Sequence, residues 1–426
     1  MDPIAQVVPF FLLALLVELL IDKVRGTGLY RANDAINSLS AGMLSTLSGY
    51  FTKLLPFLAW SYVLSNFALF DMPMSWFDAS ARGVTLWIAA ALAWDFCYYW
   101  FHRFSHEISI LWAAHAVHHQ SEDYNLSTAL RQTSTGFVFG WVFYVPLFAI
   151  GFPFEVLLIV NTVNLSYQFW VHTQVVRRMG ILDRILVTPS NHRVHHAQNP
   201  CYIDKNYGGM LILWDRLFGS FAAERDDEPV VFGVRKPLRN WNPFWANLQV
   251  YDYLWFDAVR AQRWRDKLGI WFRRTGWRPA DVEARFPKAR TPISSFRKFD
   301  PQVSKAMRRY VLIQFGVAII SALVIADLFV VAGAYAVAIP CILLGAMLYT
   351  SGLLNEGRAS AVYSEYLRLF AVMPAGAALL GWLGEPDISD AWLWGAMAAY
   401  VLASAAGLRF VARTPTYEKN NTIIIQ

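Results

Sequence analysis

The chain has 426 residues, of which 56% are hydrophobic, 16% aromatic and only 16% charged. Soluble domains contain about 25% charged residues, so this balance excludes an ordinary soluble protein and indicates a chain that crosses a membrane many times. The net charge of +6 arises largely between Arg260 and Arg309, which hold 15 of the 37 Lys and Arg residues. We therefore interpret the positive charge as a signal for the orientation of the spans and for contact with lipid surfaces, and we exclude nucleic-acid binding.

Apolar runs of spanning length occur in both halves of the sequence. They lie at about 5–22, 37–70, 83–101, 135–171, 310–332, 334–354, 360–383 and 391–411. The first run has no basic n-region and no small-residue cleavage site, which favours a span over a cleaved signal peptide. The run at 37–70 either crosses once or forms a hairpin or re-entrant pair. The predicted fold is all-α, a polytopic membrane helical bundle.

Basic residues predict how these spans are oriented. Lys23, Arg25 and Arg31 follow the first span, which places that side in the cytoplasm by the positive-inside rule. The span at 83–101 then delivers its C-terminal end to the cytoplasm, and 135–171 returns there as a hairpin. We therefore expect a multi-pass protein with a histidine-rich, two-metal helical cap on its cytoplasmic face.

Histidine is concentrated in one part of the chain. All nine histidines lie between His102 and His196, in the words HRFSH (102–106), HAVHH (115–119) and HRVHH (192–196), with His172 apart from them. The spacing i, i+4 in the first word, and i, i+3, i+4 in the other two, places the rings on one helix face. We predict eight metal ligands: His102, His106, His115, His118, His119, His192, His195 and His196.

Eight imidazoles exceed the ligand number of one metal and suit two metals with open positions. Imidazole binds Zn, Cu, Fe and Ni, so the ligands alone do not name the metal. Attack on an unactivated C–H bond of a membrane lipid requires a redox centre, which favours iron and dioxygen. A metal transporter is disfavoured, because its ligands would be distributed over several spans near the midplane.

Polar residues around the histidines are candidates for supporting roles. Asp95 lies two helical turns before His102, on the same face, and could accept an N–H from a ligand histidine. Asn161, Asn164, Gln168 and His172 form a polar stripe along another span, which faces either the metals or a neighbouring helix. Glu122, Asn125 and Asp204 lie beside the histidine words and are either supporting or simply solvated.

The chain is predicted to have three parts. Residues 1–300 form a membrane domain that carries every histidine, residues 301–411 form a C-terminal region of four spans, and residues 412–426 form a polar tail. The oligomeric state is not predicted.

The pattern HxxxH, HxxHH and a distant HxxHH resembles the fatty acid hydroxylase and sterol desaturase superfamily of membrane di-iron enzymes. Within it, WFHRFSHE (100–107), HHQSEDYNLSTALRQ (118–132), TPSNHRVHH (188–196) and IDKNYGG (203–209) are most similar to the members that cleave glyceryl ethers. The resemblance implies two irons, dioxygen, a membrane lipid substrate and tetrahydrobiopterin as reductant. It also implies a catalytic role for Glu107, which directly follows HxxxH.

The implied reaction is hydroxylation of the ether-bearing carbon of an alkylglycerol, after which the hemiacetal separates into a fatty aldehyde and a glycerol derivative. An alternative keeps the iron but changes the substrate to a sterol, a fatty acyl chain or an aminolipid. That alternative hydroxylase or desaturase would use a protein electron donor.

Overall fold

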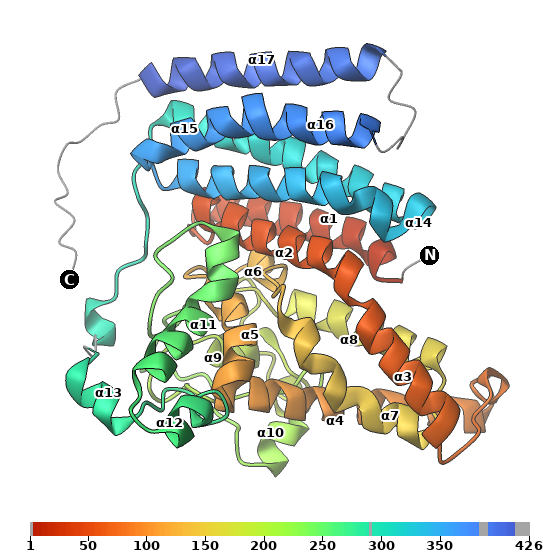
Figure 1. The fold of residues 1–426 in the computed structure, drawn as a ribbon. Coiled ribbons are helices and arrows are strands. Elements are labelled where there is room, and N and C mark those ends of the chain that lie inside the picture. Colours follow the sequence, from red (N-terminus) through yellow and green to blue (C-terminus); the bar gives the residue numbers. More distant parts are fainter. Residues whose placement is uncertain (1–2, 289–291, 383–390, 414–426) are drawn as a thin grey trace. The chain divides into compact units, whose positions relative to one another are not determined.

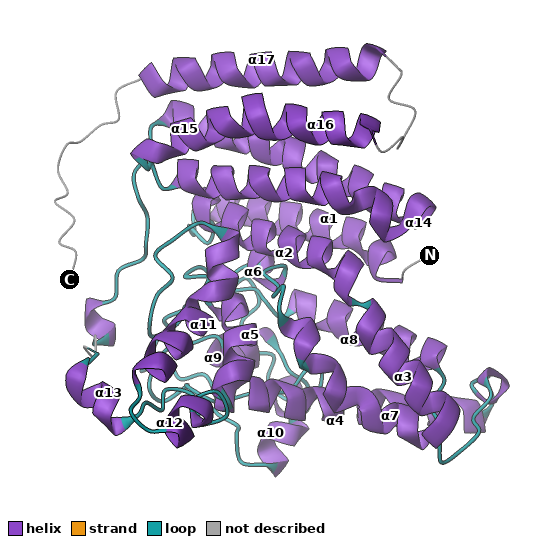
Figure 2. Cartoon of the chain, in the orientation of Figure 1, coloured by secondary structure: helices purple, strands orange, loops and turns teal. Residues whose placement is uncertain are grey.

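The computed structural model describes residues 3–288, 292–382 and 391–413, and the regular secondary structure of these ranges is helical (Figure 1, Figure 2). In the described residues β-type pairing is limited to three isolated bridges, one of which joins Ile108 to Arg274. The all-α prediction is confirmed. Most of the tail expected at 412–426 lies outside the described residues.

Three of the described helices are long and apolar enough to cross a membrane. They are α4 (Ala81–Glu107), α14 (Lys305–Asn355) and residues Trp394–Ala412 of α17 (Ala391–Arg413). At about 1.5 Å per residue α14 exceeds one bilayer crossing. Gly333 interrupts it with a φ of +80°, a conformation that glycine adopts readily. The break falls where hydropathy separates 310–332 from 334–354, so α14 consists of two successive helices.

The N-terminal run of the chain forms three helices, α1 (Pro3–Arg25), α2 (Ala32–Thr52) and α3 (Leu54–Phe67). Figure 1 shows α3 continuing from the end of α2 at an angle instead of folding back beside it. The face of α2 that is buried carries polar residues, including Asp34 and Asn37. This polar face supports the histidine region described below.

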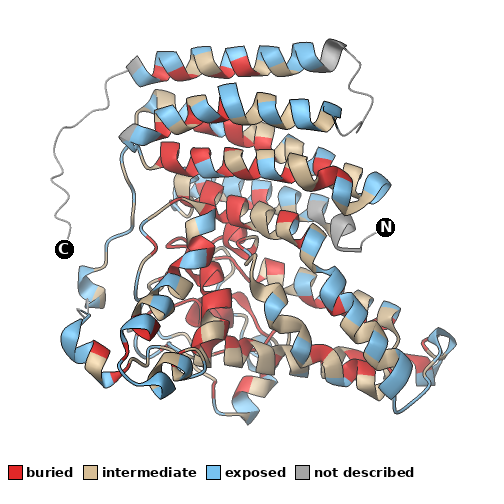
Figure 3. Ribbon diagram, viewed as in Figure 1, coloured by how far each residue is buried: buried red, intermediate tan, exposed pale blue. Residues whose placement is uncertain are grey.

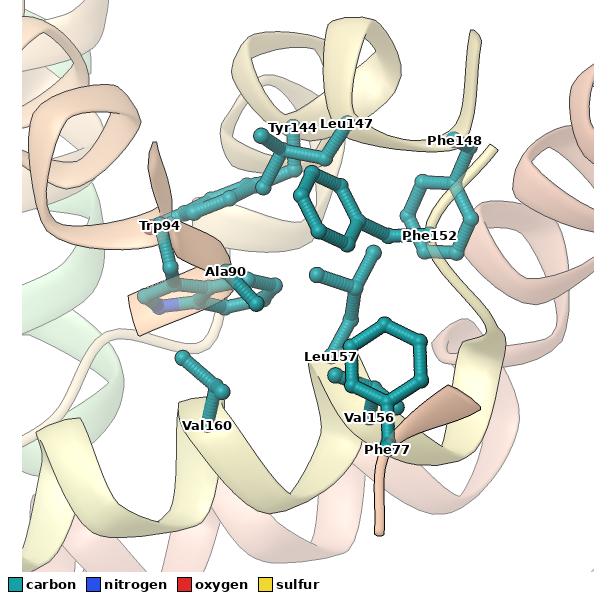
Figure 4. Packing of buried hydrophobic residues seen from close by; sticks show 10 residues of the cluster. All are labelled: Phe77, Ala90, Trp94, Tyr144, Leu147, Phe148, Phe152, Val156, Leu157 and Val160. Carbon is teal, nitrogen blue, oxygen red and sulfur yellow. The ribbon is translucent and has the colours of Figure 1, made fainter. Parts of the chain in front are cut away.

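An aromatic core holds α4 against α7 (Val145–Ile150) and α8 (Phe154–Trp170) (Figure 4). The rings of Trp94 and Tyr144 stack with centroids 4.2 Å apart, and Ala90 is fully buried between the helices. Inside a bilayer such contacts act through close packing, because lipid is as apolar as the side chains. The core brings the C-terminal ends of α4 and α8 to the same region of the protein.

Further helices, most of them short and connected by loops, follow in and around the histidine-bearing part of the chain. Their bounds are α5 (Ser109–His119), α6 (Leu126–Ala129), α9 (Pro189–His195), α10 (Leu213–Leu217), α11 (Pro243–Arg260), α12 (Trp264–Gly269) and α13 (Ala280–Arg285). Asn125 caps α6 by accepting a hydrogen bond from the Ser127 amide at 3.0 Å. Pro189 begins α9, where its missing N–H costs no helix bond. Figure 3 shows the buried residues concentrated around α5 and α9.

The chain divides into two compact units. The first comprises Met1–Leu238 with Ala246–Lys298, and the second comprises Arg239–Trp245 with Phe299–Gln426. The second contains α14, α15 (Ala359–Leu367), α16 (Met373–Trp382) and α17, with a π-helical turn at Arg368–Val372 between α15 and α16. The domain boundaries expected from the sequence stay a prediction.

Candidate metal centre

The ends of several helices bring all nine histidines together in the first unit. His102 and His106 lie on the last turns of α4, α5 carries His115, His118 and His119, and His172 follows α8. The last histidine motif, HRVHH, forms the end of α9. The ring nitrogens form two groups, and within each group the ligand atoms lie within 4.8 Å of one another.

The larger group contains five histidines. Its members are His102, His106, His115, His119 and His195. The Nε2 atom of His115 lies 3.1 Å from Nε2 of His102 and 3.0 Å from Nε2 of His119. Three separate segments of the chain, α4, α5 and α9, therefore point imidazole nitrogens at one small volume.

The smaller group contains His118, His172, His192 and His196, and all four side chains are buried. Nε2 of His172 lies 3.2 Å from Nε2 of His118 and 3.0 Å from Nε2 of His192. The two groups adjoin, because the rings of His119 and His196 stack with centroids 4.3 Å apart. The sequence left His172 open between a supporting role and none, and the structure places it among the candidate ligands.

Backbone carbonyls fix the ring orientation of four of these histidines. The Nδ1 atoms of His102 and His118 lie 2.8 and 2.9 Å from the carbonyl oxygens of Tyr207 and Arg131. Those of His172 and His195 lie 2.7 and 3.0 Å from the carbonyls of Gln168 and Lys205. A carbonyl only accepts, so each Nδ1 carries the proton and each Nε2 keeps its lone pair. This is the tautomer that binds a metal through Nε2.

The remaining nitrogens fit a metal for the same reason. Among the described residues, the buried Nε2 atoms of His106, His195 and His196 have no hydrogen-bond partner. Burial lowers the pKa of His195 and His196 well below the ordinary value, and it lowers the pKa of His118 to about 4. The rings are therefore neutral at pH 7 without a metal. Neutral imidazoles whose lone pairs converge bind Zn, Cu, Fe or Ni.

Two buried arginines, which the sequence analysis did not single out, hold these histidines in place. Arg131 donates to the carbonyl of Val117 at 2.6 Å, while its own carbonyl accepts from His118. Arg193 donates to the carbonyl of Thr173 at 3.1 Å and pairs with Glu224 at 2.7 Å. These contacts tie α5 and the segment after α8 to their surroundings. The only sequence signal was that both arginines lie inside the words that carry the family resemblance.

The carboxylate of Asp95 supports the site through a loop. It accepts hydrogen bonds from the amides of Met210 and Leu211 at 2.7 and 3.1 Å, and from Nε1 of Trp214 at 2.9 Å. The expected contact with a ligand histidine is absent from the described hydrogen bonds of Asp95, because Nδ1 of His102 contacts the Tyr207 carbonyl instead. Asp95 therefore fixes the loop whose carbonyl orients His102.

The polar stripe on α8 joins Asp95 to the smaller histidine group. Nδ2 of Asn164 donates to Asp95 at 3.0 Å, and the side chain of Gln168 donates to Asn164. The backbone carbonyl of Gln168 accepts from His172. Asn161 lies one turn further from the histidines on the same helix. The stripe thus reaches the histidines at its C-terminal end.

The other acidic and polar candidates have partners of their own. Glu107 pairs with Arg103 at 3.1 Å, and Asp204 pairs with Arg274 at 3.6 Å. Buried Glu122 lies 3.8 Å from Arg31. Asn125 caps α6 and donates to the carbonyl of Leu29 at 2.8 Å. None of these contacts reaches a histidine ring, so the roles of these residues in the reaction stay predictions.

A second carboxylate and a tyrosine beside the histidines were also missed by the sequence analysis. Asp215 accepts from the amides of Tyr207 and Gly208 at 2.7 and 2.8 Å, and its burial raises its pKa to about 6. The fully buried ring of Tyr207 lies 5.4 Å from that of His106. Their positions depend on a loop without regular structure, for which periodicity gives no signal.

The fold and the site define a helical membrane protein with two adjoining groups of histidines, each of which could hold a metal ion. The family model described as fatty acid hydroxylase matches residues 87–220, which include every histidine. No solved structure is significantly similar to this chain.

Curated relatives identify the family more closely. The chain is 41% identical over 312 residues to an alkylglycerol monooxygenase of Danio rerio, covering 73% of this chain and 68% of that protein. It is 37% identical over 316 residues to an alkylglycerol monooxygenase of Homo sapiens, covering 74% and 69%. An ornithine lipid hydroxylase of Rhizobium tropici is 32% identical over 135 residues, covering 30% and 39%. The chain belongs to the alkylglycerol monooxygenase family and is an integral membrane oxidoreductase.

Proposed function

We propose that this protein is a di-iron monooxygenase that hydroxylates the ether-bearing carbon of alkylglycerol lipids. The hydroxylated product is a hemiacetal, in which the C–O bond to glycerol breaks and releases a fatty aldehyde and a glycerol derivative. One oxygen atom of O2 enters the product and the other leaves as water, so two electrons and two protons must come from a reductant.

One observation carries the proposal more than any other. Two groups of five and four histidines adjoin at the end of α4, a helix that is long and apolar enough to cross a membrane. The match to the alkylglycerol monooxygenases of Danio rerio and Homo sapiens covers about two thirds of the length of those proteins. A lipid chain among the helices would thus have its polar end near the histidines.

The proposed iron ligands are the nine histidines, five for one ion and four for the other. With about six positions around each ion, this leaves positions for dioxygen or substrate. Iron bound there would supply the redox chemistry that side chains lack. The protein's own contribution is to keep each ring neutral, correctly oriented and shielded from water.

Tetrahydrobiopterin is the proposed reductant, through the resemblance stated above. Glu107 remains the proposed catalytic carboxylate next to the larger group, since it directly follows His106 on α4. Its side chain is only partly buried, with 24% exposure, so a cofactor could approach it. Asp95 is proposed as a positioning residue that acts through the loop at Tyr207.

We further propose that the histidine face is cytoplasmic. The basic residues after α1 and between Arg260 and Arg309 support this orientation through the positive-inside rule. A cytoplasmic face would also give the site access to a soluble reductant.

A second candidate function is hydroxylation of a different lipid with a protein electron donor. The similarity to an ornithine lipid hydroxylase favours it, because that relative acts on an aminolipid by name. The match to that protein covers only 39% of its length, however, against 68% for the alkylglycerol monooxygenase of Danio rerio.

The experiment is an assay of purified protein with iron(II), air and an alkylglycerol, with and without tetrahydrobiopterin. Pterin-dependent release of fatty aldehyde is the expected result. A His195→Ala variant, shown to remain in the membrane fraction, is the control for adventitious iron. If a wild-type sample with about two irons per chain releases no aldehyde, the ether-cleaving function is wrong, and other lipids become the substrates to test.

A further inference from the structure

The segment Arg263–Arg274, which we call the basic segment, exposes large apolar side chains outside the candidate spans. Trp264 and Leu268 are four residues apart on one face of α12, with 76% and 65% of each side chain exposed. Phe272 follows in the next turn and is 73% exposed. The opposite side of this segment is anchored, because Ile270 is fully buried.

Basic side chains accompany these apolar groups. The basic segment contains Arg263, Arg265, Lys267, Arg273 and Arg274, and its one acidic residue is Asp266. Four of the five basic residues are exposed, while Lys267 is half-buried. A surface that combines bulky apolar side chains with an excess of positive charge complements anionic headgroups above an apolar layer.

Backbone hydrogen bonds attach the basic segment to the end of a candidate span. The carbonyls of Trp271 and Arg273 accept from the amides of Ile110 and Ser109 at 2.9 and 3.0 Å. The amide of Thr275 donates to the carbonyl of Glu107 at 3.1 Å. Glu107 is the last residue of α4, one of the candidate spans. The basic segment is therefore attached to the end of a helix that is long and apolar enough to span a membrane.

We propose that the basic segment is a docking surface for anionic phospholipid. Trp264, Leu268 and Phe272 enter the boundary between headgroups and acyl chains, and the surrounding arginines contact the phosphates. Because the same segment is bonded to the junction of α4 and α5, this docking fixes the height of that junction relative to the bilayer. His106 and His115 lie on either side of the junction, so the surface also positions the histidine site at the lipid boundary.

The test measures the depth of a label at position 268 in full-length protein reconstituted into nanodiscs. A Cys97→Ser, Cys201→Ser, Leu268→Cys variant is labelled with bimane, and quenching by doxyl-labelled phospholipids is recorded. The matched control is the Cys97→Ser protein labelled at Cys201, which is exposed in a loop outside the basic segment, whereas the remaining Cys341 is buried. Nanodiscs contain phosphatidylcholine alone or with added phosphatidylglycerol.

We expect several-fold stronger quenching at position 268 than at Cys201, and a further increase when phosphatidylglycerol is added. Arg263→Glu with Arg265→Glu should remove the increase while preserving the elution volume of the folded protein. Equal quenching in the two lipid compositions would overturn the proposal. So would a label at 268 that no lipid quenches but that an added soluble acidic protein shields, since the surface would then serve a protein partner.

Discussion

The Nε2 atoms of His118 and His172 lie 3.2 Å apart, although 54 positions separate the two residues in the sequence. Both Nδ1 atoms face backbone carbonyls, so both Nε2 atoms carry lone pairs. Two facing lone pairs repel unless a cation lies between them. This contact makes His172 a proposed ligand of the same standing as the eight histidines of the repeated words.

Replacement of His172 by alanine tests this assignment. We expect His172→Ala to lower bound iron from about two to about one per chain and to abolish turnover, because the smaller group keeps only three imidazoles. The measurement is metal content by mass spectrometry on protein purified with iron(II). Gln168→Ala is the matched control, since only the backbone carbonyl of Gln168 orients His172. Full iron content in His172→Ala would return it to a structural role.

Helical periodicity determines how much of the site the sequence could predict. Residues three and four positions apart lie on one helix face, so the spacings in HAVHH and HRVHH alone predicted that the rings of each motif share a face. The structure brings the eight histidines of the three motifs together. His172 has no neighbouring histidine, and only the packing of α8 against α4 brings it to the others. Likewise Asp95 was found by helical phase, but its loop partners at Met210 and Leu211 have no periodicity to predict them.

The sequence predicted the fold to about the same extent as it predicted the site. Hydropathy placed a break between 332 and 334, where Gly333 interrupts α14, because an apolar run of that length cannot be one crossing. The run at 37–70 was ambiguous because hydropathy does not report bends. The structure ends α2 at Thr52 and begins α3 at Leu54.

Asp95→Asn should destabilise the loop that orients His102. The amide oxygen can still accept hydrogen bonds, but the amide NH2 group would face the N–H donors of Met210, Leu211 or Trp214. We expect a loss of about 1–3 kcal/mol in stability, from a buried donor left without a partner. Thermal unfolding in detergent measures it, together with iron content, which should remain near wild type. Asn164→Ala removes a single donor to Asp95 and should cost less. Wild-type stability and turnover would show that the loop is held by other contacts.

Glu107→Gln should leave the metal ligands undisturbed. The carboxylate pairs with Arg103 across a partly exposed surface, and such pairs contribute about 0–1 kcal/mol. We therefore expect nearly normal stability and iron content, with a fall in turnover that reflects the proposed catalytic role. Steady-state kinetics with varied reductant and varied lipid would show which step needs the carboxylate. Arg103→Gln removes the same ion pair, together with the hydrogen bonds from Arg103 to Tyr99 and to the carbonyl of Phe218 at 3.0 and 3.3 Å. If both variants behave alike, the carboxylate has only a structural role.

Metal-free protein should lose stability as the pH falls from 7 to 5. Burial lowers the pKa of His118 to about 4, whereas an unfolded histidine titrates near 6.5. Below pH 6.5 the unfolded state binds more protons than the folded state, so stability decreases with falling pH. For His118 alone the loss of stability between pH 7 and pH 5 is about 2 kcal/mol. Thermal unfolding after chelation measures it, and a His118→Asn variant should show a shallower slope. A slope of the opposite sign would mean that the rings are charged in the folded protein.

The second unit should depend on a buried ion pair rather than on the histidines. Arg368 lies in the π-helical turn and pairs with Glu365 at 2.6 Å, with exposures of 2% and 1%. Tyr310 donates to Glu365 at 2.8 Å, and Arg368 donates to Gln314 at 3.1 Å, which joins α14 to the pair.

Arg368→Met leaves the carboxylate of Glu365 buried without its cation, at a cost of about 3–5 kcal/mol. Arg368→Met combined with Glu365→Gln should recover much of that loss, because no charge remains to be desolvated. Unfolding of these two variants and of Glu365→Gln alone in detergent gives the coupling between the two side chains. If the region from residue 301 is a separate domain as predicted, both variants should retain the iron content of the wild type. Loss of iron in step with the loss of stability would instead make the chain one cooperative unit.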